Sequence, residues 1–180
     1  MTIPQEGTQK GLPGEVMMWV LIFSEIAVFG AGLAAFMGMR LTDPAGFAAA
    51  RTHLMVELAG TNTIILVTSG LFAALAVIAT STRAARGWLA AAAALGMLFL
   101  WLKGIEYAAK SAEGITFETH SFFTFYYLLT GFHAAHVLAG IVLLGLVGWS
   151  AQPRVIQTGA AFWHMVDLVW VLLFPVIYLL

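Results

Sequence analysis

Long apolar stretches alternate with short polar ones along all 180 residues of the chain. A helix that crosses a membrane needs about 20 predominantly apolar residues, because each residue advances the helix by about 1.5 Å across a hydrocarbon layer of about 30 Å. Several stretches reach this length. The pattern predicts five transmembrane helices, at residues 16–39, 58–82, 88–109, 121–149 and 156–180.

None of the polar stretches between these spans is long enough for a soluble domain. They fall at residues 40–57, 82–87, 110–120 and 150–155. Residues 1–15 are also polar, and they lack the charged, apolar and small-residue regions of a cleaved signal peptide. We expect a polar N-terminal tail followed by a single transmembrane domain, residues 16–180. The predicted fold class is an all-α integral membrane bundle.

The composition supports a membrane location. Hydrophobic residues make up 61% of the chain and charged residues only 9%, which is typical of membrane proteins. The chain has no cysteine, which excludes disulfides, iron–sulfur clusters, thiolate zinc sites and haem attached through cysteine. A formal net charge of −1 provides no basic surface field, so nucleic acid is not an expected partner.

Basic residues and tryptophans near the ends of the spans predict an orientation. Basic residues favour the cytoplasmic side, and tryptophans gather at both membrane interfaces. The basic residues on the N-terminal side are Lys10, Arg83, Arg86 and Arg154. The opposite side has Arg40, Arg51 and Lys110, with Lys103 near that interface. This small difference predicts a cytoplasmic N-terminus and a periplasmic C-terminus. The tryptophans expected in an interfacial belt on the N-terminal side are Trp19, Trp88, Trp149 and Trp163.

Several ionisable side chains fall near the middle of the predicted spans. They are Glu25, His133, His136 and Asp167. A charged side chain in the middle of a membrane costs on the order of 3 kcal/mol on insertion scales, so such residues are usually paired or functional. His164 and Asp167 are three residues apart on one helix face, which allows a hydrogen bond or an ion pair between them.

Each of these groups has a structural and a functional interpretation. His133 and His136 suit metal or haem ligation, but two histidines three residues apart share a helix face, so we favour hydrogen-bonded packing. For His164 and Asp167 we favour a structural clasp between helices, with proton handling as the alternative. Glu25 suits either a proton relay or a simple hydrogen-bond donor. We expect the two histidines and the clasp to form a polar joint between the last two spans.

Other polar residues predict contacts between helices. Asn62 and Thr63 lie in the second span, where amides and hydroxyls hydrogen-bond across helix contacts. Lys103 and Glu106 are three residues apart near the end of the third span, which predicts an ion pair at the membrane interface. The sequence shows no nucleophile with its base, no phosphate-binding loop and no set of three metal ligands. The residues therefore predict neither catalysis nor a cofactor in this chain.

Five segments carry a resemblance to a known family. They are SEIAVF from Ser24, NTIILVTSG from Asn62, KGIEY from Lys103, FYYLLTGFHAAHVLAG from Phe125 and FWHMVDLVWVLLF from Phe162. With these segments the chain resembles subunit III of the haem-copper oxidases. The last two segments are the most specific in combination. The chain is similar to a five-helix form that lacks the first two helices of the mitochondrial-type subunit.

The resemblance implies a non-catalytic, cofactor-free accessory subunit in the bacterial inner membrane. Its partner would be a catalytic subunit that holds haem with iron or copper, and phospholipid would bind in a cleft between the helices. Glu25 would correspond to the carboxylate of the family that reacts with carbodiimide. His164 and Asp167 would correspond to the histidine and aspartate of its last helix.

Within the family, the short length and the last two segments are most similar to the accessory protein of bacterial nitric oxide reductase, the NorE type. Ala134 replaces a usual glycine and Val77 a frequent histidine of the oxidases, which favours this branch. We therefore expect an accessory subunit of nitric oxide reductase. The alternative is subunit III of a terminal cytochrome c or quinol oxidase. A hypothesis of another class is an independent proton or small-solute carrier that uses the ionisable groups at mid-depth.

Overall fold

The computed structural model describes residues 16–150 and 152–180, and the regular structure in these residues is helical. The helices in chain order are α1 (Val16–Thr42), α2 (Pro44–Arg51), α3 (Val56–Val77), α4 (Thr82–Ala112), α5 (Ser121–Ser150), α6 (Pro153–Phe174) and the π-helical η1 (Pro175–Leu179). Five spans in the described residues, formed by α1, α3, α4, α5 and α6 with η1, are long and apolar enough to cross a membrane. This confirms the predicted all-α bundle of five transmembrane helices. The predicted tail, residues 1–15, lies outside the described residues.

Capping side chains extend the helices into stretches that the sequence predicts as loops. The Ser81 hydroxyl accepts a hydrogen bond from the Ala84 N–H at 3.2 Å, so α4 begins at Thr82 rather than at residue 88. Asp43 accepts from the Gly46 N–H at 3.0 Å in the same way, and Pro44 follows it at a position where the missing N–H costs nothing. As a result, residues 44–51 form the short helix α2, which the sequence analysis did not predict.

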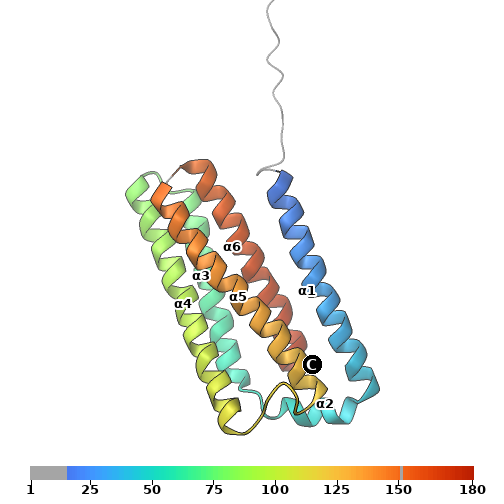
Figure 1. Ribbon diagram of the computed structural model, residues 1–180. Coiled ribbons are helices and arrows are strands. Elements are labelled where there is room, and N and C mark those ends of the chain that lie inside the picture. The colour runs from blue at the N-terminus through green and yellow to red at the C-terminus, as the bar shows by residue number, and fades with distance from the viewer. Residues whose placement is uncertain (1–15, 151) are drawn as a thin grey trace, which may run out of the picture.

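The four helices α3, α4, α5 and α6 form the compact part of the bundle, and α1 stands at its edge (Figure 1). Helix α6 contacts α3, α5 and α1, so it lies at the centre of the arrangement. Only Phe29 and Phe36 of α1 are buried, whereas nine residues of α6 are buried. Helix α1 is therefore attached by a narrow contact, and α6 organises the core.

A buried tryptophan lies at the centre of the compact part. Trp163 is fully buried, so its predicted place in an interfacial belt is wrong. Two glycines make room for its ring, because a Cβ added at Gly96 or Gly140 would come within 2.6 and 2.7 Å of ring carbons of Trp163. The prediction failed because the sequence alone does not show whether a tryptophan near the end of a span faces the lipid headgroups or fills a gap that glycines leave between helices.

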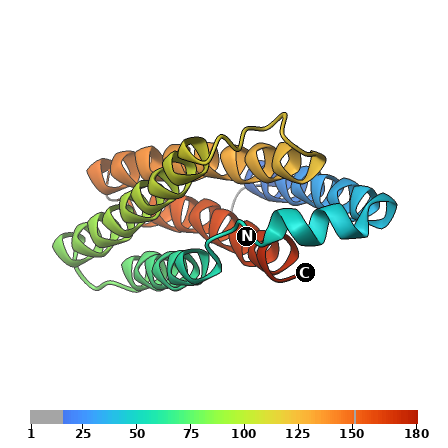
Figure 2. The same cartoon turned by 90° about the horizontal axis from the view of Figure 1, so that it is seen from below.

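The C-terminal end of the bundle is closed by α2 and the loop before α5. Asp43 Oδ2 lies 3.1 Å from His120 Nε2, which connects α2 to the start of α5. Arg51 donates a hydrogen bond to the backbone carbonyl of Leu179 and connects α2 to η1. These contacts bring the polar residues before α3 and α5 to the same end of the bundle as the C-terminus (Figure 2).

Candidate functional site

Glu25 finds its partner on another helix. Its carboxylate Oε2 lies 3.1 Å from Nε2 of His136, which joins α1 to α5. His136 Nδ1 lies 2.9 Å from the Phe132 carbonyl, which only accepts, so Nδ1 carries a proton. The two groups lie within ion-pair distance, but Glu25 Oε2 makes no hydrogen bond within the described residues. The two side chains are 20% and 16% exposed, respectively, so this contact lies close to the bundle surface.

His133 points into the core instead of toward Glu25. Its side chain is fully buried and its ring stacks on Trp170 of α6 with centroids 5.1 Å apart. Phe99 of α4 contacts the same ring edge-on at 5.6 Å. Neither ring nitrogen of His133 has a hydrogen-bond partner among the described residues. His133 thus does pack α5 on α6, but through an aromatic ring and not through His164 or Asp167.

The predicted polar joint between the last two spans is accordingly wrong in its partners. Asp167 lies over Gly70 of α3, where an added Cβ would come within 2.4 Å of its Oδ2. Within the part of the chain that the structure describes, no hydrogen bond joins Asp167 to His164, and the buried Oδ1 of Asp167 has no partner. His164 is exposed on the same helix. The prediction failed because helix spacing fixes which residues share a face, but not which helix that face meets.

Lys103 and Glu106 form the predicted ion pair, with Lys103 Nζ at 2.7 Å from Glu106 Oε2. The pair is enclosed by the bundle, because the two side chains are only 2% and 0% exposed. Tyr178 of η1 donates a hydrogen bond to Glu106 Oε1 at 3.0 Å and accepts one from Lys103. Both charges are therefore paired and hydrogen-bonded inside the bundle, as buried charges require.

Aromatic rings enclose this pair. Lys103 Nζ lies between 4.9 and 5.4 Å from the centroids of four rings, which belong to Tyr107, Tyr126, Trp170 and Tyr178. A cation over an aromatic face is stabilised by the ring quadrupole, most of all where water is excluded. We call Lys103, Glu106 and these four rings the aromatic cage. Its aromatic members were not predicted from the sequence, although tyrosines in apolar helices near a lysine and a glutamate were the available signal.

Hydroxyl groups of α3 accept hydrogen bonds from the tryptophans of α6. Trp163 Nε1 donates to Ser69 Oγ at 3.0 Å, and Ser69 in turn donates to the Ala92 carbonyl of α4 at 2.8 Å. Two turns along α6, Trp170 Nε1 donates to Thr63 Oγ1 at 3.0 Å. Thr63 thus makes the predicted contact between helices. Asn62 is fully buried, but its side chain has no partner among the described residues.

The structure provides no grouping of metal ligands. Within residues 16–150 and 152–180, no three or more His, Cys, Asp or Glu side chains lie close enough together to hold a metal ion. Of the predicted residues, the structure brings together Glu25 with His136, and Lys103 with Glu106. His133, Asn62, His164 and Asp167 have no hydrogen-bonding protein partner in the described residues.

A bundle of five apolar helices, with polar pairs between the helices, defines a multi-pass membrane protein. Comparison with known proteins agrees with this class. Residues 5–180 match the family model described as cytochrome c oxidase subunit III. The chain therefore belongs to the cytochrome c oxidase subunit III family.

Relatives are similar over most of their lengths. Cytochrome c oxidase subunit 3 of Corynebacterium diphtheriae is 32% identical over 99% of this chain and 94% of its own length. The protein of the same name from a Synechocystis strain is 33% identical over 94% of this chain and 78% of its own. A probable quinol oxidase subunit 3 of Staphylococcus epidermidis is 25% identical over 96% of this chain and 92% of its own. These names favour the terminal oxidase alternative over the nitric oxide reductase interpretation.

Proposed function

We propose that this protein is the non-catalytic subunit III of a bacterial terminal oxidase that takes electrons from cytochrome c or from a quinol. The observation that carries the proposal is the family match over residues 5–180, together with relatives of nearly equal length that are named as subunit 3 of such oxidases. Its partner is then the catalytic subunit, which holds the haem of the complex. The protein lies in the inner membrane, with the N-terminus in the cytoplasm.

The structure supports a stabilising role for the chain. The aromatic cage and the tryptophan contacts fix α3, α4, α5 and α6 to one another, so the bundle presents a rigid face to a neighbour. Glu25 and His136 place two ionisable groups in contact near the bundle surface, which fits a role in the proton environment of the partner. An independent proton carrier would instead need polar groups connected from one end of the bundle to the other.

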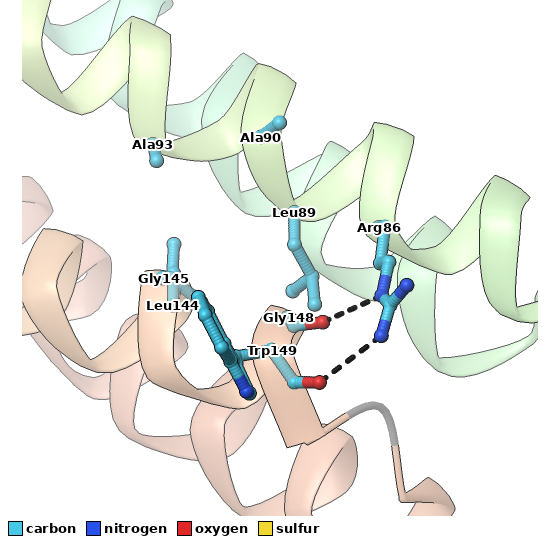
Figure 3. A pocket seen from close by; sticks show the side chains of 8 residues that line it. All are labelled: Arg86, Leu89, Ala90, Ala93, Leu144, Gly145, Gly148 and Trp149. Atoms are coloured by element: carbon cyan, nitrogen blue, oxygen red, sulfur yellow. Dashed lines mark hydrogen bonds between the residues drawn. The ribbon is translucent and has the colours of Figure 1, made fainter.

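Phospholipid is the second expected component. A groove of about 540 Å³ lies between α4 and α5, next to Arg86 and Trp149 (Figure 3). Arg86 uses Nε and Nη2 to donate to the carbonyls of Gly148 and Trp149 at 2.8 and 3.0 Å, which leaves Nη1 for a phosphate. We propose that an anionic phospholipid lies here, with its acyl chain along the small residues Ala90, Ala93 and Gly145.

The function is tested by isolating the chain from its native membrane in a mild detergent. We expect a large haem-bearing subunit to co-purify and the complex to consume oxygen with cytochrome c or a quinol as donor. Reduction of nitric oxide without oxygen consumption would restore the nitric oxide reductase interpretation. Purified alone and placed in liposomes, the chain should not dissipate a pH gradient beyond empty vesicles. A flux that Glu25→Gln abolishes would instead support the carrier.

A further inference from the structure

One side of α6 is open and carries polar residues at mid-depth. In the view along the bundle, α5 covers one side of α6, α3 and α1 flank it, and no described helix covers the side opposite α5 (Figure 2). His164 is exposed, as are Leu168 and Val171 at 47% and 45%, and these three positions follow one another at helical spacing. We call this stripe, together with Asp167 beside it, the open face.

The depth of the open face excludes water and headgroups as partners. The span runs from Pro153 to Leu179, so Asp167 lies in the middle of its 27 residues. At about 1.5 Å per residue it is roughly 20 Å from either end of the helix. Acyl chains offer no hydrogen bonds, and ionisable side chains at this depth are found facing protein rather than lipid. Because His164 is ionisable and exposed on this face, protein rather than acyl chains is the expected cover of the open face in the membrane.

Asp167 indicates what the covering protein has to supply. Its Oδ1 is enclosed without a partner in the described residues, whereas its Oδ2 is not fully enclosed and also makes no hydrogen bond there. Gly70 leaves space for this oxygen between α6 and α3. The buried carboxyl group of the aromatic cage, Glu106, has its partners within the chain. A carboxyl group kept at mid-depth without such partners fits a donor that arrives from another molecule.

We propose that a transmembrane helix of the catalytic partner subunit packs along the open face and donates a hydrogen bond to Asp167. The inference rests on the proposed function, because it takes the occupant from the complex in which this chain works. The neighbouring residues Leu168 and Val171 supply the apolar contact for that helix. A second copy of this chain would place two Asp167 carboxyl groups near each other at the same depth, which the catalytic partner does not.

Photo-crosslinking in native membranes tests the position of the partner. A photoreactive phenylalanine derivative placed at Leu168 should give a product with the combined mass of this chain and the catalytic subunit. The matched control is Leu138 of α5, which is 56% exposed on another helix and should give only lipid adducts. If the haem-bearing subunit co-purifies but only the Leu138 position crosslinks to it, the inference is overturned and the proposed function stands. A product of twice the mass of this chain also overturns it.

Substitution of Asp167 tests the hydrogen bond. Leucine keeps the branching of aspartate at Cγ but replaces both oxygens with methyl groups, so Asp167→Leu should reduce the haem that co-purifies per chain about tenfold, while Asp167→Asn keeps an acceptor and most of the haem. The thermal unfolding of the isolated chain in detergent should be equal for both variants and the native protein. Equal haem recovery for Asp167→Leu and native protein would overturn the inference, and so would a loss of haem that parallels a loss of folding.

Discussion

Two pairs of ionisable residues, each three apart on an apolar helix, differ in every other respect. Lys103 and Glu106 lie fully buried in the aromatic cage, with each charge hydrogen-bonded. His164 and Asp167 lie on the open face, where one side chain is exposed and the other has a buried oxygen without a partner in the described residues. The difference separates a pair that holds the chain together from a pair that is left for another molecule.

The neighbouring residues explain this difference. Tyr126 of α5, Trp170 of α6 and Tyr178 of η1 converge on the α4 pair, and the aromatic cage therefore joins four elements of the chain. Asp167 lies beside Gly70, which has no side chain to offer. Buried charges that find their counter-charge and hydrogen bonds within the chain stabilise the fold. Ionisable groups without such partners in the chain destabilise it until another molecule supplies them.

The largest effect is expected at the aromatic cage. Glu106→Gln leaves the Lys103 ammonium buried without its counter-charge, so the free energy of unfolding should fall by about 3 kcal/mol or more. The double variant Lys103→Met with Glu106→Gln removes both charges and should recover most of this loss. Equilibrium unfolding in detergent measures both. Asp167→Asn is the matched control on the open face and should change the isolated chain by less than about 0.5 kcal/mol. Similar losses for Glu106→Gln and Asp167→Asn would contradict the comparison.

The next effect concerns the glycines that admit Trp163. Gly96→Ala places a Cβ about where the ring lies, at 2.6 Å from a ring carbon, and should destabilise the bundle by about 1–3 kcal/mol through overpacking. Gly104→Ala on the same helix is the control, because nothing lies within 4 Å of its added Cβ. That variant should be neutral or slightly stabilising, since alanine favours helix. A neutral Gly96→Ala would show that the core near Trp163 is looser than the structure indicates.

The sequence determines the spans well because length and apolar composition alone decide what crosses a membrane. It also places Lys103 and Glu106 on one face, since that depends only on helical spacing. The sequence does not predict the contacts of Glu25 with His136 and of Trp163 with Ser69. Each joins residues far apart in the chain, and which helices become neighbours depends on packing of the whole bundle. The burial of Lys103 was not predicted for the same reason. The sequence around a lysine near a helix end does not indicate that four aromatic rings will enclose it.

A smaller effect on stability is expected at the contact between α1 and α5. The side chains of Glu25 and His136 are more exposed than those of Lys103 and Glu106 but less exposed than His164. Glu25→Ala removes the partner of His136 and should lower the stability of the α1 contact by on the order of 1 kcal/mol. Glu25→Gln should cost less, because its amide can donate to Nε2 while Nδ1 donates to the Phe132 carbonyl. Protease sensitivity of α1 in detergent measures this order. A loss for Glu25→Gln equal to that of Glu25→Ala would indicate that α1 is held by the charge of Glu25 and not by a polar contact that an amide can replace.

The smallest effect is expected at the exposed contact between α2 and the start of α5. The Gly46 N–H, and then His120, hold the pKa of the Asp43 carboxyl group below its usual value of 3.8. A lowered pKa in the folded state means that the ionised form is favoured by folding, so its contribution is present above pH 3.8 and is lost as the pH falls through the lowered pKa.

Hydrogen exchange of the α2 amides, corrected for intrinsic rates, should therefore stay constant from about pH 7 to about pH 5 and accelerate below about pH 4. Asp43→Asn should remove this acceleration, because its side chain cannot titrate. Glu118→Gln, at an exposed carboxyl group in the same loop region, should leave the profile unchanged. If the Asp43→Asn protein still opens α2 at low pH, the closing of this end depends on other groups. Exposure alone does not set Asp167 apart, because the exposed Asp43 has its partners within the chain whereas the buried Oδ1 of Asp167 has none in the described residues.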